Sequence, residues 1–229
     1  MRIVLLGGAG YLGSAASHHL AALGHQVTVV DGLIYRRGDD PARLLPPSVS
    51  FVHGDLRDPE MLATASAGAD TVVHLGGVVG EPASQVDERL AVELNYASPL
   101  IAADAARRAG IGHFVFFSSC SVYGMHEGTV DEDTAPNPLG VYARTKVLAE
   151  RQLPCALGEQ VALTSLRLAT VHGSSPRQRL DSVVNKMAAT AAATGRIHLN
   201  GGGQRRPSST STTSPTCSPA SWSSASPAR

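Results

Sequence analysis

A set of glycines directly behind the first apolar segment is the feature that most constrains this chain. Residues 2–6 form that segment, Gly7, Gly10 and Gly13 follow, and a helical pattern begins at residue 11. Glycines at this spacing allow a tight turn and let backbone N–H groups approach a ligand, while the start of a helix attracts negative charge. Strand, turn and helix in this order predict a pyrophosphate-binding turn for a dinucleotide.

An acidic residue at the end of the second expected strand indicates which dinucleotide this is. Asp31 follows the β-branched segment 26–30. A carboxylate at this place accepts hydrogen bonds from the ribose hydroxyls and repels a 2′-phosphate. Asp31-Gly32 is also a good turn signal, and Arg36 or Arg37 could accept a 2′-phosphate. The upstream glycines favour the binding role, and we expect NAD.

Short apolar segments alternate with helical patterns along most of the chain. We expect strands at 2–6, 26–30, 50–53, 71–75, 113–118 and 161–168, and helices at 11–23, 59–67, 90–109, 141–157 and 180–194. Apolar strands that alternate with helices are typical of an α/β fold with a doubly wound parallel sheet of the Rossmann type.

The character of the sequence changes near its end. We expect a dinucleotide-binding domain over 1–173 and a remnant of a smaller substrate-binding subdomain over 174–206, with a short strand at 197–199. Residues 207–229 are mostly Ser, Thr, Pro and Ala, a composition that cannot bury a core and predicts disorder.

Composition argues against several function classes. The 19 basic and 19 acidic residues balance, which does not suit a nucleic-acid surface. The apolar segment before Gly7 is too short for a signal peptide or a membrane span. The three cysteines lack metal or disulfide spacing. We expect a cytoplasmic protein that uses no metal and binds neither nucleic acid nor membranes.

A tyrosine and a lysine four residues apart carry the expected chemistry. Tyr142 and Lys146 lie on one face of the helix expected at 141–157. A phenol has a pKa of about 10, and a nearby ammonium group together with the positive nicotinamide ring would lower it toward neutral pH. Ser119 follows the fifth expected strand and could bind the reacting oxygen. Such a pair is common by chance on solvated helices, so the order of the motifs matters.

Together these motifs resemble the extended short-chain dehydrogenase/reductase family of NAD-dependent epimerases and dehydratases. The resemblance runs from residue 2 to about residue 206. It includes His74-Leu75-Gly76-Gly77, the segment from Ser118 to Gly124, and the segment from Tyr142 to Glu150. It implies NAD contacts at Gly7, Gly10, Tyr11, Leu12, Gly13, Asp31, Asp55, Leu56, Leu75, Gly76, Gly77, Asn95, Tyr142 and Lys146.

Individual roles follow from the same resemblance. Asp55 and the N–H of Leu56 would face the adenine, and Asn95 would hold a water and brace the site, unless it is a surface asparagine. Ser119, Ser121 and Arg206 would bind a nucleotide-diphosphate sugar, although Arg206 could equally be part of a solvated basic pair. His74 is expected to be structural.

The implied reaction is hydride transfer between NAD and a sugar carbon while Tyr142 removes the hydroxyl proton. Dehydratases of the family usually carry Asp-Glu after the Ser or Thr, where this chain has Cys120 and Ser121. We therefore expect a 4-epimerase type, with catalysis by Ser119, Tyr142 and Lys146. A ketoreductase or dehydrogenase, a dehydratase and a non-catalytic NAD-binding remnant stay open. A homodimer could form through the helices at 90–109 and 141–157.

The final segment departs from the family pattern. Relatives continue after Pro207 with a Phe-Ile-His-Val-Asp-Asp-Val-Ala-like segment. A GC-rich message can encode Arg-Arg-Pro-Phe-Ile-His-Val-Asp-Asp-Val at this place. If this message loses one C in the proline codon, its translation becomes Arg-Arg-Pro-Ser-Ser-Thr-Ser-Thr-Thr-Ser. This is the sequence of the chain from Arg205 onward. We hypothesise that a single-base frameshift replaced the C-terminal part of the substrate domain.

Overall fold

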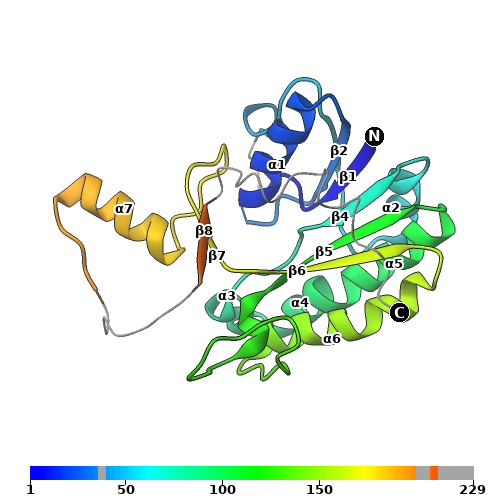
Figure 1. Cartoon of the computed structure of the whole chain (residues 1–229). Helices are drawn as coiled ribbons and strands as arrows, with labels where there is room; N and C mark the ends of the chain where they lie inside the picture. Colours follow the sequence, from blue (N-terminus) through cyan, green and yellow to red (C-terminus); the bar gives the residue numbers. More distant parts are fainter. Residues whose placement is uncertain (36–39, 200–206, 211–229) are drawn as a thin grey trace.

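The central element of the molecule is a parallel sheet. A computed structural model describes residues 1–35, 40–199 and 207–210. Six parallel strands follow the order β3-β2-β1-β4-β5-β6 (Figure 1). Their bounds are β1 Arg2–Leu6, β2 Gln26–Asp31, β3 Ser50–His53, β4 Thr71–His74, β5 His113–Ser119 and β6 Ala162–Leu168. The reversal of strand order between β1 and β4 confirms the doubly wound Rossmann-type fold.

Helices cover both faces of this sheet (Figure 1). The helices are α1 Tyr11–Ala22, α2 Pro59–Ser66, α3 Glu81–Val86, α4 Glu88–Val92, α5 Ser98–Arg108, α6 Val141–Leu157 and α7 Val183–Thr194. The described residues also include two 3₁₀ turns, η1 Pro41–Arg43 and η3 Cys120–Tyr123. A π-helical turn, η2 Glu93–Ala97, lies between α4 and α5. Helices α2, α5 and α6 pack on one face, and α1 lies on the other.

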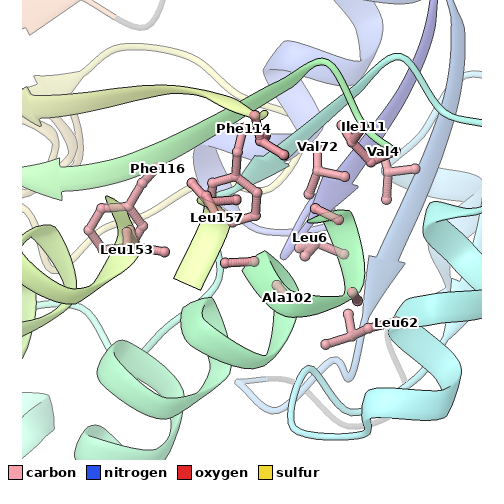
Figure 2. Close-up of a cluster of buried hydrophobic side chains, with 14 of the residues drawn as sticks. Val4, Leu6, Leu62, Val72, Ala102, Ile111, Phe114, Phe116, Leu153 and Leu157 are labelled. Atoms are coloured by element: carbon pink, nitrogen blue, oxygen red, sulfur yellow. The ribbon is translucent and has the colours of Figure 1, made fainter. Parts of the chain in front are cut away.

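Alternate residues of the central strands supply two separate cores. Val4 and Leu6 of β1 point toward α2, α5 and α6, where Phe114 and Leu153 are also buried (Figure 2). Ile3 and Leu5 of the same strand join a second cluster on the α1 side. A strand that is buried on both faces needs apolar residues at every position, which explains the continuous apolar run at 3–6.

Local signals set the start of α2. Asp58 accepts hydrogen bonds from the backbone N–H groups of Glu60 (3.0 Å) and Met61 (3.1 Å), and Pro59 occupies the first helical position. Such a cap satisfies N–H groups that have no partner inside the helix.

Four expectations differ from the structure. The helix expected at 90–109 is α4, η2 and α5 in succession, because a π-helical turn interrupts it. Residues 197–199 form no strand, and none of the strands in the described part of the chain pairs with them. Helix α3 and strand β7 (Thr170–His172) were not expected. Strand β8 (Ser208–Thr210) pairs with β7, so these three residues contradict the expected disorder; strand pairing uses backbone groups and tolerates polar side chains.

The C-terminal elements stand apart from the sheet (Figure 1). Of the side chains on α7, only Asn185 is buried, and Val183 and Val184 are exposed. No helix within the described residues has the length and apolarity needed to cross a bilayer. In the same part of the chain, no three His, Cys, Asp or Glu side chains group as metal ligands.

Candidate active site

The glycine turn lies at the carboxyl ends of β1 and β4. Gly7 has a φ of +81°, and a Cβ built on it would overlap the backbone of Gly76. A Cβ on Gly13 would overlap the backbone of Gly8. Gly10 precedes α1 without any side-chain cap, so the first N–H groups of this helix remain open to a ligand. The turn is therefore a cradle that only glycines can form, next to an uncapped helix start.

The carboxylate of Asp31 lies beside this turn. Its Oδ2 accepts from the N–H of Ala9 (3.0 Å), and its Oδ1 accepts from the N–H of Leu33 (2.8 Å). These bonds fix the side chain at the end of β2 while it stays half-buried. A carboxylate has about four acceptor positions, so Asp31 keeps capacity for two further donors.

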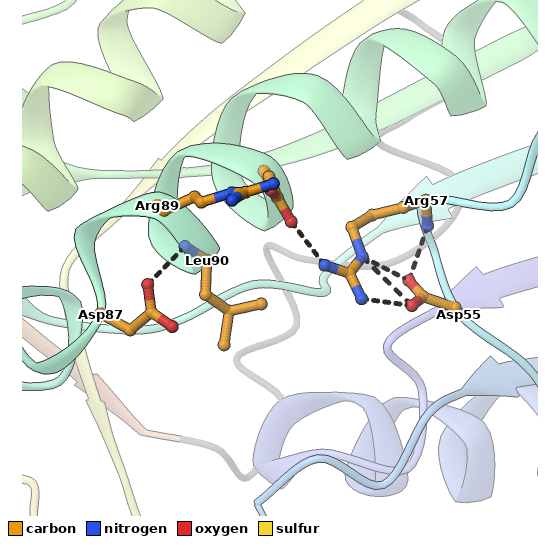
Figure 3. Close-up of polar contacts among 6 residues, drawn as sticks. Asp55, Arg57, Asp87, Arg89 and Leu90 are labelled. Carbon is orange, nitrogen blue, oxygen red and sulfur yellow. Dashed lines mark hydrogen bonds and ion pairs between the residues drawn. The ribbon is translucent and has the colours of Figure 1, made fainter.

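Asp55 lies in a charged network that the sequence did not reveal (Figure 3). Its carboxylate accepts from the guanidinium of Arg57, which lowers the pKa of Asp55. Arg57 also pairs with Glu93, which pairs with Arg89 on the next turn of helix. The network joins the loop after β3 to α4 and η2. The signal in the sequence was the arginine two residues after Asp55.

Asn95 fixes the loop that follows β4. It is fully buried in η2, which contradicts the surface alternative. Its Oδ1 accepts from the N–H of Val78 and its Nδ2 donates to the carbonyl of Val78, both at 2.9 Å. The expected role of Asn95 in holding a water stays a prediction. A Cβ on Gly77 would overlap Asn95, and one on Gly76 would overlap the side chain of Leu56. We call residues 76–80 the cofactor loop.

His74 is structural, as expected. It is completely buried at the end of β4 and hydrogen-bonds to Ser98 at 2.9 Å. Burial lowers the pKa of His74 to about 3, so the ring is neutral at physiological pH.

Three expected catalytic residues meet at the carboxyl end of β5. Tyr142 is buried, and burial raises the pKa of its phenol, while a hydrogen bond with Ser119 and the positive charge of Arg179 lower it. Burial outweighs these two partners, so the lowering expected from Lys146 together with the nicotinamide ring stays a prediction for the NAD-bound site. The Nζ of Lys146 donates to the carbonyl of Phe117 (2.8 Å) and lies 4.7 Å from the centre of the Phe116 ring. Burial also lowers the pKa of Lys146, to about 8.

The other expected substrate residues are divided between described and undescribed segments. Ser119 donates to the hydroxyl of Ser121 (3.1 Å) and accepts from its N–H (3.2 Å). Both hydroxyls thus lie together at the start of η3. Arg206 lies outside the described residues.

Arg179 and Tyr35 at this site were missed in the sequence. Arg179 pairs with Asp181 (2.9 Å), and its charge acts on the phenols of both Tyr142 and Tyr35. Tyr35 donates to the carbonyl of Gly77 (3.3 Å) and accepts from the N–H of Val79 (3.0 Å). The available signal was the basic Arg177-Gln178-Arg179 segment shortly after Gly173.

Tyr11 and Asn185 connect α7 to the glycine turn. The Tyr11 hydroxyl donates to the carbonyl of Gly173 (2.9 Å) and accepts from Asn185 (3.2 Å). Asn185 also accepts from the N–H of Gly173 and donates to the carbonyl of Arg179, both at 2.9 Å. The segment that carries Arg179 is thereby held next to the start of α1.

Comparison with known proteins agrees with this arrangement. Residues 3–208 match the NAD-dependent epimerase/dehydratase family. The chain belongs to this family. The match ends close to residue 206, where the resemblance in the sequence also stops.

Similar proteins include sugar-nucleotide epimerases and a reductase. The chain is 33% identical over 183 residues to a UDP-glucose 4-epimerase of Azospirillum brasilense, a match that covers 78% of this chain and 51% of that one. It is 31% identical over 217 residues to a 2-alkyl-3-oxoalkanoate reductase of Stenotrophomonas maltophilia, covering 90% and 60%. The solved structure of MoeE5 in complex with UDP-glucose and NAD superimposes with a TM-score of 0.77, at 28% identity, over 92% of this chain and 68% of that one.

Length separates this family member from its relatives. The chain spans about half the length of the curated UDP-glucose 4-epimerases it matches, with shares of 51%, 52% and 53% for three of them. The family match over residues 3–208 includes all six strands of the parallel sheet except the first residue of β1, and it includes the candidate catalytic residues.

Proposed function

We propose that this protein has the active site of an NAD-dependent nucleotide-sugar epimerase-type oxidoreductase. The observation that carries the proposal is the meeting of Ser119, Tyr142 and Lys146 at the carboxyl edge of the sheet, on the side where the glycine turn lies. Ligands of doubly wound sheets bind at this edge, near the point where the strand order reverses.

The residues of the turn suit NAD. The glycine cradle and the uncapped start of α1 would hold the pyrophosphate, and the Asp31 carboxylate would accept from the ribose hydroxyls. Arg57 already donates to both carboxylate oxygens of Asp55. Asp55 would therefore bind the adenine through the lone pairs that Arg57 does not use. When bound, NAD supplies a hydride acceptor beside the reacting sugar carbon.

The protein residues would manage the proton. Ser119 would donate a hydrogen bond to the sugar oxygen, and Tyr142 as phenolate would take the hydroxyl proton from it. Because burial opposes formation of the phenolate, its partners must stabilise the negative charge: Ser119, Arg179 and the ammonium of Lys146 are the available donors and charges. Lys146 would also bind the nicotinamide ribose with a hydrogen not used by Phe117.

The neighbours of Ser119 favour epimerisation over dehydration. Elimination of water requires a paired acid and base next to the reacting hydroxyl. This chain has Cys120 and Ser121 there, and Ser121 is engaged with Ser119. The relatives named as UDP-glucose 4-epimerases support a nucleotide-diphosphate sugar as substrate.

Product analysis with purified protein tests the proposal. The protein, with its reading frame restored after Pro207, is incubated with NAD and UDP-glucose, and formation of UDP-galactose is followed by chromatography. We expect interconversion that Tyr142→Phe abolishes, because the phenylalanine keeps the packing and removes the proton acceptor. Product formation that survives in Tyr142→Phe contradicts the assigned role.

A reductase is the second candidate function. The match to the oxoalkanoate reductase covers 90% of the chain, more than the matches to the epimerases. Both reactions use the same Ser119, Tyr142 and Lys146 chemistry. Oxidation of NADH by a 2-alkyl-3-oxo acid, with no conversion of UDP-glucose, would favour this reading.

A further inference from the structure

Helix α6 begins without a cap from its own sequence. Gly140 occupies the capping position and has no side chain, and the first bond within the helix runs from the N–H of Arg144 to the carbonyl of Gly140 (3.0 Å). The N–H groups of Tyr142 and Ala143 come before this bond and have no partner inside the helix. An acceptor for them must come from another part of the chain.

Glu81 supplies that acceptor from a distant segment. Its Oε2 accepts from the N–H of Tyr142 (3.3 Å), and its Oε1 accepts from the N–H of Ala143 (3.1 Å). A Cβ on Gly140 would overlap the Glu81 carboxylate, so the glycine makes room for it. Negative charge at this end of a helix is favourable.

We propose that Glu81 is a positioning residue that holds the first turn of α6, and with it Tyr142, against the cofactor loop. Glu81 is the first residue of α3 and directly follows Gly80, the last residue of this loop. Asn95 fixes the same loop at Val78. The two side chains thus connect the loop on one side to η2 and on the other to the catalytic helix. This inference rests on the proposed role of Tyr142 in proton transfer.

Amide hydrogen exchange in the full chain tests the cap directly. In Glu81→Ala, the amides of Tyr142 and Ala143 lose their acceptors, and we expect their exchange to accelerate about tenfold or more, as for loss of a hydrogen bond to a charged group. Gly140→Ala should have the same effect, because its Cβ displaces the carboxylate. Asp58→Ala is the matched control, since Asp58 makes two equivalent bonds at the start of α2. It should accelerate exchange only at Glu60 and Met61.

The pKa of the Tyr142 phenol in the folded protein is a second measurement, and a loss of overall stability does not by itself change it. Loosening the first turn admits water, so the pKa that burial raises should fall toward its ordinary value of 10 in Glu81→Ala and in Gly140→Ala. It should not move in Asp58→Ala. The titration is followed by ultraviolet absorbance, as the difference between each variant and the same variant carrying Tyr142→Phe.

A second cap should restore both properties. Serine is a good capping residue, and the backbone of Gly140 is extended, so any residue can adopt it. In the double variant Glu81→Ala with Gly140→Ser, the new hydroxyl can accept from the first turn, and exchange and titration should return toward the wild type. Unchanged exchange and titration in Glu81→Ala, or an equal change at Tyr142 in Asp58→Ala, overturns the proposal.

Sugar turnover separates this inference from the proposed function. In the frame-restored protein, Glu81→Ala should lower kcat for UDP-glucose conversion about 100-fold with little change in NAD affinity, because small misplacements of reacting groups cost rates of this order. A frame-restored parent protein without turnover contradicts the proposed function. Exchange and titration then still decide whether Glu81 positions Tyr142.

Discussion

Tyr142 and Lys146 are buried side chains whose protonation depends on what surrounds them. Burial raises the pKa of Tyr142 and lowers that of Lys146 to about 8, so both effects favour the neutral forms. The spacing of the two residues was readable from the sequence, but the burial that governs their charges is a property of tertiary packing. The position of Arg179 near Tyr142 is also a property of tertiary packing, because Asn185 and Tyr11 are among the residues that hold its segment there.

The lowered pKa of Lys146 predicts a pH dependence of stability. Below about pH 8 the folded protein carries a buried charge, and the cost of burying it is fully present. As pH rises from about 8 to the ordinary value of 10.5, the folded state releases this proton before the unfolded state does, and the cost disappears. Relative to Lys146→Met, the wild type should gain up to about 3 kcal/mol in unfolding free energy across this range. Urea unfolding of both proteins at pH 7 and pH 10 measures this difference in unfolding free energy. If the unfolding free energies of the wild type and Lys146→Met change equally between the two pH values, the prediction is contradicted.

Gly7 and Gly24 form a matched pair for testing the glycine cradle. Both have a φ of +81°, but a Cβ on Gly7 overlaps Gly76, whereas a Cβ on Gly24 meets no atom within 4 Å. Gly24→Ala should cost only the backbone strain, about 1–2 kcal/mol. Gly7→Ala should cost more and should abolish NAD binding. Calorimetric NAD titration and urea unfolding of both variants give the answer, and equal behaviour of the two would show that the cradle is not needed.

The central strands β1, β4 and β5 were predictable because each contains a continuous apolar run that is buried on both faces. The edge strands β3 and β6 are only partly buried, and their β-branched and alternating apolar residues were the signal. Shorter elements were not predictable. Helix α3 has six residues, too few for a helical repeat, and β7 has three. Strand β8 consists of Ser and Thr, whose side chains give no sign of a strand, and it forms by backbone pairing with β7. The segment Ile197-His198-Leu199 alternates like a strand but forms none, because three residues are too few for this pattern to decide.

Asn185 should determine whether α7 stays packed against the start of α1. Its side chain bonds to Tyr11, Gly173 and Arg179, and it is the only buried side chain on the helix. We expect Asn185→Ala to increase thermolysin cleavage within residues 174–195 about tenfold, while the sheet resists digestion. The neighbouring exposed Lys186→Ala is the control. Equal cleavage of Asn185→Ala and wild type would contradict this role.

The whole molecule pairs a complete sheet with a small C-terminal part. The parallel sheet, the glycine turn and the candidate catalytic residues are all present, whereas the match to curated epimerases reaches about half of their length. We propose that the remaining substrate-binding residues are encoded in the shifted reading frame that begins at the codon of Pro207. The side chains of Val183, Val184, Ile197 and Leu199 are exposed, and a family-like segment in the restored frame would cover apolar surface of this kind.

Restoring the reading frame tests that proposal. Resequencing across the Pro207 codon should reveal one missing C, and the restored protein should carry the family-like segment after residue 207. We expect it to stay soluble at concentrations where the present chain aggregates, because the apolar residues near α7 become covered. Light scattering of both proteins measures this, and an unbroken message that encodes no family-like segment in another frame would refute it.

Label transfer from sugar to cofactor tests the central claim most directly. UDP-glucose carrying deuterium at the sugar C4 is mixed with NAD and the frame-restored protein, the reaction is quenched within the first turnover, and the reduced cofactor and the sugar are analysed by mass spectrometry. With the wild-type residues we expect deuterium in the reduced cofactor during the turnover and again at C4 of the UDP-galactose that forms, and with Tyr142→Phe no deuterium in the cofactor. UDP-galactose that carries solvent hydrogen at C4 in place of the deuterium, or equal labelling of the cofactor with Tyr142→Phe, would contradict the proposed hydride transfer.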